Sequence, residues 1–201
     1  MRGLNEAYRR AAAAIDAANA EDPTIVVVRG SAQPLALVHG RLAVAWVERL
    51  LESPDDGVLL AARAHHLRRW EVPRASYPEG RPGYLRWRRD QKARHAADVA
   101  GLLEVAGYSR TVIERVQALI RREGLGTDPD AQAVEDAAGL VFLETQLADV
   151  SSRLDHDHLL DVIRKTARKM SPAGLALVAE VPLGPDELAL LAAALTPPSP
   201  R

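Results

Sequence analysis

Apolar residues recur at spacings of three and four along most of the chain, and prolines or glycines divide them into short blocks. This spacing places apolar side chains on one face of an α-helix, and the abundant Ala and Leu favour helix over strand. A β-branched run at 25–28 is isolated, and a lone strand has no sheet to join, so we expect an extended loop over 24–34. The sequence therefore predicts an all-α fold.

Turn-forming residues set the limits of the expected helices. No shift in composition marks a boundary, so we expect a single helical domain over 1–195 with about eight or nine helices, followed by a disordered Pro-rich tail at 196–201. The loop at 72–83 contains several prolines and carries aromatic and basic residues. The helices are expected at about 3–20, 35–51, 58–70, 84–106, 110–123, 129–152, 156–169, 172–179 and 186–195.

Composition excludes several classes of site. The chain of 201 residues has no cysteine, which rules out disulfides, thiolate metal sites and cysteine nucleophiles. No apolar stretch is long enough to cross a membrane, and the N-terminus shows no signal-peptide pattern. The net charge of −1 gives no argument for nucleic-acid binding. We expect a cytoplasmic protein without a membrane partner; the sequence is compatible with an oligomer.

Four of the six histidines fall on apolar helical stripes, together with one aspartate. Buried imidazoles and carboxylates are costly unless something pairs them. A divalent transition metal (Mn, Ni, Co, Fe or Zn) would satisfy them together, since imidazole and carboxylate are its usual ligands. Neighbouring helical residues diverge by about 100°, so two adjacent histidines bind one ion only if it lies between them. The candidate ligands are His39, His65, His66, His95 and Asp136.

A second interpretation is equally open. A histidine on an apolar stripe is often a core residue that is hydrogen bonded to a carbonyl group. All four histidines could be buried in this way without a metal. His156 and His158 lie among acidic residues at a helix start, where we expect a solvated cap. Asp98, Glu135 and Glu144 are candidates for a general base or for a partner of the ligands.

The segment from Arg63 to His95 is strongly basic. It holds ten Lys or Arg against three acidic residues, and half of the aromatic residues of the chain. Guanidinium groups bind phosphate with two hydrogen bonds, and aromatic rings stack on bases. The segment therefore suits a small anionic substrate, possibly a nucleotide, although a structural loop pinned by its aromatic residues fits equally well. The candidate contacts are Arg69, Trp70, Arg74, Tyr77, Tyr84, Arg86, Trp87 and Arg88.

The order His39, His65-His66, Asp136 on helices resembles the HD superfamily of metal-dependent phosphohydrolases. Its pattern has a His-Asp pair where this chain has His65-His66. The resemblance implies an HD-like helical bundle and a hydrolase acting on a small phosphorylated or nucleotide-like substrate. The alternatives are a di-iron oxygenase of the same fold and a non-catalytic module that binds a nucleotide or a partner.

A second resemblance covers nearly the whole chain. It rests on the motifs IDAANAEDP, AARAHHLRRWEVPRASYP, RPGYLRWR, VEDAAGLVFLE and RKTARKMSPAG. These are similar to an uncharacterised bacterial and fungal family, a domain of unknown function. The family pattern is closer to Gln-His at 65–66, which implies that His66 is the more important histidine of the pair.

Overall fold

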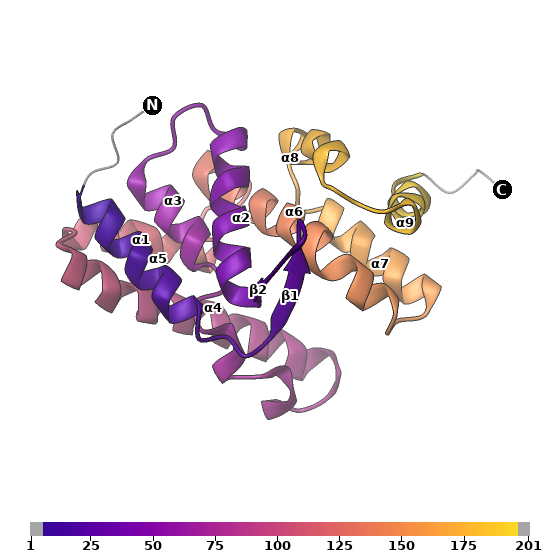
Figure 1. Ribbon diagram of the computed structural model, residues 1–201, viewed down its shortest axis with the longest axis horizontal. Helices are drawn as coiled ribbons and strands as arrows, with labels where there is room; N and C mark the ends of the chain where they lie inside the picture. The colour runs from indigo at the N-terminus through magenta and orange to yellow at the C-terminus, as the bar shows by residue number, and fades with distance from the viewer. Residues whose placement is uncertain (1–5, 197–201) are drawn as a thin grey trace.

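The computed structural model describes residues 6–196 and confirms the all-α prediction (Figure 1). The described part holds nine α-helices, three short 3₁₀ segments and one hairpin. The predicted helix start at residue 3 and nearly all of the predicted tail lie outside it. The helices are α1 (Glu6–Asn19), α2 (Leu35–Leu50), α3 (Asp56–Ala64), α4 (Gly80–Ala106), α5 (Arg110–Arg121), α6 (Pro129–Ser151), α7 (His156–Ala167), α8 (Pro172–Leu177) and α9 (Pro185–Leu195).

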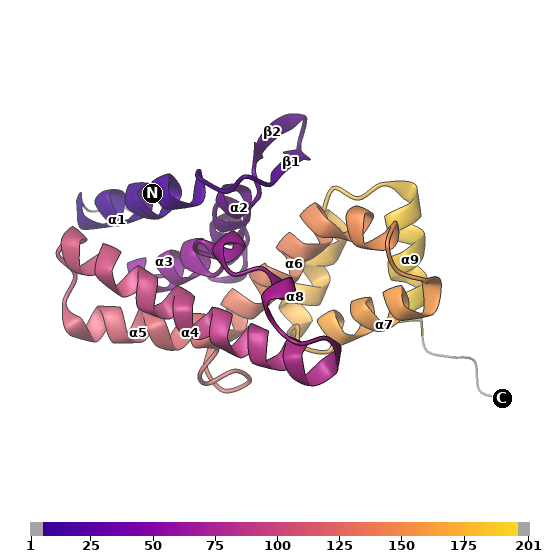
Figure 2. The same ribbon diagram turned by 90° about the horizontal axis from the view of Figure 1, so that it is seen from below.

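Helix α2 lies at the centre of the molecule and packs against α3 on one side and α6 on the other. Helices α4 and α5 lie beside each other beneath α1 and α3, whereas α7 and α9 pair at the far end of the molecule (Figure 2). Buried apolar side chains form one continuous core that extends from Tyr8 to Ala194. Helix α2 thus joins α3 to α6 in the middle of the fold, whereas α4 packs on α5 and α1.

The extended loop expected over 24–34 is instead an antiparallel hairpin. Strand β1 (Ile25–Val28) pairs with β2 (Ser31–Pro34), so that Val28 lies opposite Ser31. Arg29 and Gly30, between the strands, both adopt positive φ values of 50° and 78°, as the favoured two-residue hairpin turns require. The β-branched run therefore finds its partner strand at residues 31–34, directly after a two-residue turn, which the sequence interpretation overlooked.

The helix predicted at 58–70 ends earlier, at Ala64. Residues 65–68 form a turn, and Arg68 has a left-handed backbone with φ of 50°. Two 3₁₀ turns, η1 (Arg69–Glu71) and η2 (Arg74–Ser76), then lead to α4. Both histidines of the pair therefore lie at the C-terminal end of α3. No helix in the described part of the chain is long and apolar enough to cross a membrane.

Candidate metal centre

Three helices position the four inward histidines. His39 lies in α2, His65 and His66 follow the last residue of α3, and His95 lies in α4. Gly40 lets α2 approach α3, because a Cβ atom there would lie 2.5 Å from the carbonyl oxygen of Arg63. This close approach brings the His39 ring beside the two rings that follow α3.

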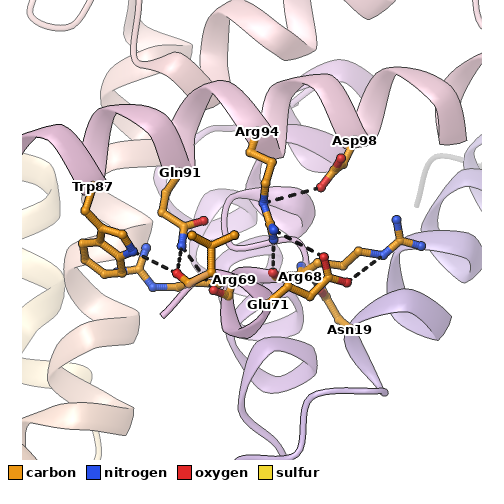
Figure 3. Close-up of polar contacts among 9 residues, drawn as sticks. Asn19, Arg68, Arg69, Glu71, Trp87, Gln91, Arg94 and Asp98 are labelled. Atoms are coloured by element: carbon orange, nitrogen blue, oxygen red, sulfur yellow. Dashed lines mark hydrogen bonds and ion pairs between the residues drawn. The ribbon is translucent and has the colours of Figure 1, made fainter. Parts of the chain in front are cut away.

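The turn after α3 is fixed to α4 by a series of polar contacts (Figure 3). The Gln91 amide donates to the carbonyl oxygens of Arg69 and Val72, and the Trp87 indole nitrogen also donates to Val72 at 2.9 Å. Arg94 donates to the carbonyl oxygen of Arg68. These contacts occupy backbone acceptors that a helix would otherwise use, so they hold the non-helical path that orients His65 and His66.

His39, His65 and His66 offer one nitrogen each, and these three atoms all lie within 4.8 Å of one another. The His65 and His66 ring centroids are 4.1 Å apart, and those of His39 and His66 are 5.2 Å apart. The side chains of two neighbouring helical residues would point about 100° apart. Because α3 ends before His65, the rings of His65 and His66 lie side by side instead. We call these three residues the histidine triad.

Hydrogen bonds assign the tautomer of His39. The Thr145 hydroxyl donates its one proton to the carbonyl oxygen of Val141 at 2.7 Å, so it can only accept from His39 Nε2, which lies 2.9 Å away. His39 Nδ1 therefore carries a lone pair, and it lies 3.0 Å from His66 Nδ1. Two ligands bound at about 2.1 Å to one ion are roughly 3.0–3.4 Å apart. The pair has the spacing of two nitrogens on one ion; without an ion, His66 donates to His39.

His65 is oriented in the same manner. Its Nδ1 lies 2.8 Å from the carbonyl oxygen of Ala62, which can only accept, so Nδ1 holds the proton. Its Nε2 carries the lone pair and is buried without a hydrogen-bond partner in the described structure. A metal-binding histidine commonly has its second nitrogen held by a carbonyl or hydroxyl group in this way. An orphaned lone pair of this kind is what a metal ion would satisfy.

Burial keeps all four inward histidines neutral. It is the largest cause that lowers the pKa of His39, His65 and His95 to about 3, and nearby positive charges lower these pKa values further. Burial also lowers the pKa of His66 well below its usual value. Neutral imidazole is the form that binds a metal ion. The triad is therefore ready to bind without prior loss of charge at physiological pH.

His95 is near the triad but does not share its compact geometry. Its ring centroid is 6.2 Å from that of His66, and neither ring nitrogen has a partner at hydrogen-bond geometry in the described structure. The Leu67 backbone is close enough to raise the pKa of His95, but this effect is smaller than the lowering caused by burial. His95 thus lies beside the triad, and its nitrogens are not part of the cluster that the three triad nitrogens form.

Asp136, predicted as the carboxylate ligand, is held elsewhere. Its carboxylate accepts from the Ser171 backbone at 2.9 Å, the Ser171 hydroxyl at 2.6 Å and the Gln132 amide at 2.8 Å. Gly174 permits this contact, because a Cβ atom there would lie 2.6 Å from Asp136 Cγ. The structure therefore uses Asp136 to fasten the start of α8 to α6, and it does not bring this carboxylate into the triad.

The other candidate carboxylates are paired with cations. Glu135 accepts from Arg122 at 2.8 Å and lies 4.0 Å from Lys169, whereas Asp98 lies 4.0 Å from Arg94. Glu144 has a buried side chain, and it accepts from Arg29 of the hairpin through one oxygen, while its other oxygen is unpartnered. None of these carboxylates belongs to the described group of clustered ligand atoms.

The residues predicted to bind substrate separate into two groups. Arg69 stacks on the face of Trp87 at 4.4 Å, and Arg88 lies over Tyr84 at 5.8 Å. Arg69 adjoins the triad. Burial is the largest cause that lowers the pKa of His66, followed by the nearby His65, and the charge of Arg69 lowers this pKa further. Trp70 is half-buried in η1.

The second group shapes the loop instead. Arg74 donates to the carbonyl oxygens of Tyr77 and Pro78 at 2.9 and 2.8 Å, and the Tyr77 hydroxyl donates to Asp90 at 3.2 Å. Arg86 lies 3.7 Å from Asp90. The basic loop is therefore partly the structural loop of the alternative interpretation and partly the wall of a site.

The sequence interpretation missed Thr145, Lys92 and Arg122. Lys92 is one helical turn after Arg88, and this spacing could have placed it on the same face of α4. Arg122 was not recognisable, because it leaves α5 with a left-handed backbone and its side chain is only 7% exposed. Thr145 required knowledge of how α6 packs on α2.

Two cavities of the described structure lie away from the triad. The larger, about 420 Å³, is lined by Asp56 at the start of α3, by Tyr108 before α5 and by residues of α5 such as Thr111. The smaller is an apolar gap among α6, α7, α8 and α9. The histidines instead sit in the packed interior, where half-buried His66 and Arg69 are nearer to solvent than the fully buried His39 and His65.

Comparison with known proteins locates the chain in one family. No curated protein and no solved structure matches it, so the resemblance to HD phosphohydrolases stays a prediction. A family profile does match, over residues 9–191, which include every residue of the site described above. The chain therefore belongs to the DUF4202 family, a domain of unknown function.

Proposed function

We propose that the protein is a metal-dependent hydrolase acting on a small phosphorylated substrate, with His39, His65 and His66 as the metal ligands. The observation that carries this proposal is the convergence of neutral imidazoles whose outer nitrogens are held by Thr145 and Ala62. Three histidine ligands leave a coordination position open, as in catalytic zinc sites.

The protein's own residues would supply orientation and charge. Thr145 and the Ala62 carbonyl hold the tautomers of His39 and His65, and Arg69 places a positive charge beside the triad. A bound divalent ion lowers the pKa of water and polarises a phosphoryl oxygen. In the hydrolysis, a bond from the water oxygen to phosphorus forms, the ester P–O bond breaks, and the departing alcohol takes up a proton.

The donor set favours this chemistry over a di-iron oxygenase. Di-iron sites in helical bundles rely on several carboxylate ligands, whereas the candidate carboxylates described here contact arginines, a serine or a glutamine. A triad without a carboxylate matches a hydrolytic ion better. The non-catalytic alternative stays open to the same test, because it requires that the triad bind no metal.

The test begins with metal analysis of protein purified without chelator, followed by titration of the chelator-treated protein with Mn, Ni, Co, Fe and Zn. We expect close to one ion per chain and metal-dependent hydrolysis of phosphate esters. His66→Ala should lose both properties. His158→Ala, on the exposed start of α7, is the matched control and should keep them. A folded wild-type protein that binds none of these ions would overturn the proposal.

A further inference from the structure

Positive charge gathers beside the triad without matching negative charge. Burial is the largest cause that lowers the pKa of four cations, which lie in η1, in α4, at the end of α5 and before α8, and the positive charge of Arg88 lowers all four pKa values further. Glu135 is an acidic group beside three of them. We call Arg88 and these four cations the cation cluster. Its members are Arg69, Arg88, Lys92, Arg122 and Lys169.

Glu135 compensates only part of this charge. It accepts from Arg122 at 2.8 Å and lies 4.0 Å from Lys169. Within the described structure, Arg69, Arg88 and Lys92 form no ion pair, and the guanidinium groups of Arg69 and Arg88 lie against aromatic rings. Arg115 provides a contrast, because it contacts both Asp128 and Asp130. Among the described residues, Arg69, Arg88 and Lys92 thus lack the acidic partners that Arg115 has.

The unpaired cations are also partly removed from water. Burial is the main cause that lowers the pKa of Arg69 to about 10 and that of Lys92 to about 8. The positive charge of Arg88 lowers both further, and Arg122 contributes at Lys92. Half-buried like charges held together cost free energy unless an anion joins them.

The cluster and the triad belong to one electrostatic environment. The Arg69 backbone N–H donates to the carbonyl oxygen of His66 at 3.1 Å, and the Arg69 guanidinium lies 4.4 Å from the centre of the Trp87 ring on α4. A divalent ion on the triad would add positive charge to a region in which cations already outnumber carboxylates. An anion that contacts the cluster would remove this repulsion, and the ion would in turn attract the anion.

We propose that Arg69, Arg88 and Lys92 bind a phosphate dianion beside the histidine triad, and that this anion and the metal ion bind cooperatively. The proposal rests on the proposed function and names its substrate class: compounds with a terminal phosphoryl group. The dianion could be free phosphate or the phosphoryl group of a phosphomonoester, since both present the same oxygens to guanidinium and ammonium groups.

The test is calorimetric titration of the metal-free and the metal-loaded full chain, once with inorganic phosphate and once with adenosine monophosphate. We expect the metal to tighten phosphate binding at least about tenfold, and phosphate to tighten metal binding by the same factor, because coupling is reciprocal. Tighter binding of the nucleotide than of phosphate would identify the ester as the source, and the reverse order would identify the free ion.

Matched variants separate the cluster from general charge. Arg88→Met and Lys92→Met should weaken phosphate binding about tenfold or more. Arg86→Met removes the same charge from the same helix, at a residue that contacts Asp90, and should change phosphate binding less than about twofold. Circular dichroism checks that each variant is folded.

The outcomes distinguish this proposal from the metal site. Metal binding without binding of either phosphate compound would overturn the anion site and leave the metal centre standing. Phosphate binding that Arg88→Met abolishes, in a protein that binds no metal, would support the anion site and overturn both the cooperativity and the hydrolase. Equal losses in Arg86→Met and Arg88→Met would overturn the assignment to the cluster.

Discussion

The histidines at the centre of the molecule and those at the start of α7 behave in opposite ways. His158 is exposed and its Nδ1 lies 2.5 Å from Asp155, which raises its pKa. His39 is 2% exposed and hydrogen bonded to a neutral hydroxyl, and burial lowers its pKa to about 3. Burial and the charge of the partner, rather than residue type, thus decide whether a histidine of this chain is more easily protonated or stays neutral.

The largest expected effect that separates the two sets is acid sensitivity of the metal-free protein. The pKa values of His39, His65 and His95 are near 3 when folded and near 6.5 when unfolded, so between these pH values the unfolded chain binds more protons. The free energy of unfolding should therefore fall as pH decreases below about 6.5, by up to about 1.4 kcal/mol per pH unit for each buried histidine.

Urea denaturation between pH 7.5 and 5 measures this slope. His95→Leu removes one buried imidazole outside the triad and should make the slope shallower. His158→Ala should not make the slope shallower. The pKa of His158 is raised in the folded protein, so this residue stabilises the fold at low pH, and that stabilisation is lost as pH rises. An identical slope in wild type and His95→Leu would contradict the assignment of neutral buried histidines.

The next largest effect is on metal affinity. His39→Ala should weaken metal binding by roughly 100-fold or more, since it removes a ligand and not merely a group that orients one. His156→Ala, at an exposed histidine of α7, should change the affinity less than about twofold. Titration calorimetry measures both variants. Comparable losses in the two would show that the ion is not bound by the buried set.

A smaller effect is expected at the residue that orients His39. Thr145→Val removes the hydroxyl that accepts from His39 Nε2 and should weaken metal binding about tenfold, as loss of such partners does in other metal sites. Thr145→Ser retains the hydroxyl and should restore the affinity. Failure of the serine variant to do so would indicate that the methyl group of Thr145, rather than its hydroxyl, positions the ring.

The smallest effect on the site is expected at Asp136. Asp136→Asn weakens the contacts with Ser171 and Gln132 and should lower the free energy of unfolding by about 1–2 kcal/mol. Metal affinity should change less than about twofold, because the contacts of this carboxylate lie at the start of α8. A large loss of metal would restore Asp136 as a ligand; thermal melts and metal titration of the same samples decide.

Periodicity alone predicted the helices and the inward histidines well, because both depend on spacing within one segment. The α2 stripe placed His39 inward, and the structure shows it buried. The predictions failed or stayed incomplete where contacts between distant segments determine the position of a side chain or the end of a helix. Gln91 and Arg94 hold the carbonyl oxygens of Arg69 and Arg68 in the turn that follows α3, and Ser171 donates to the carboxylate of Asp136.

The hairpin escaped prediction for a local reason. Its turn relies on Arg29 in a left-handed conformation, which non-glycine residues seldom adopt, and the sequence Arg-Gly is not a strong turn signal. The division of the basic residues between site and loop depended on α4. Arg86 and Arg88 are two residues apart, yet the helix turns one toward Asp90 and the other toward the cation cluster.

The contacts that join the chain after α3 to α4 also determine how the centre can move. His66 and Arg69 are three residues apart, and the carbonyl oxygens that follow them are held by Gln91 and Trp87. Arg88 and Lys92 project from that same stretch of helix. A displacement of α4 would therefore move His66 and the side chains of Arg69, Arg88 and Lys92 as a unit, so the proposed metal and phosphate sites would keep a fixed separation.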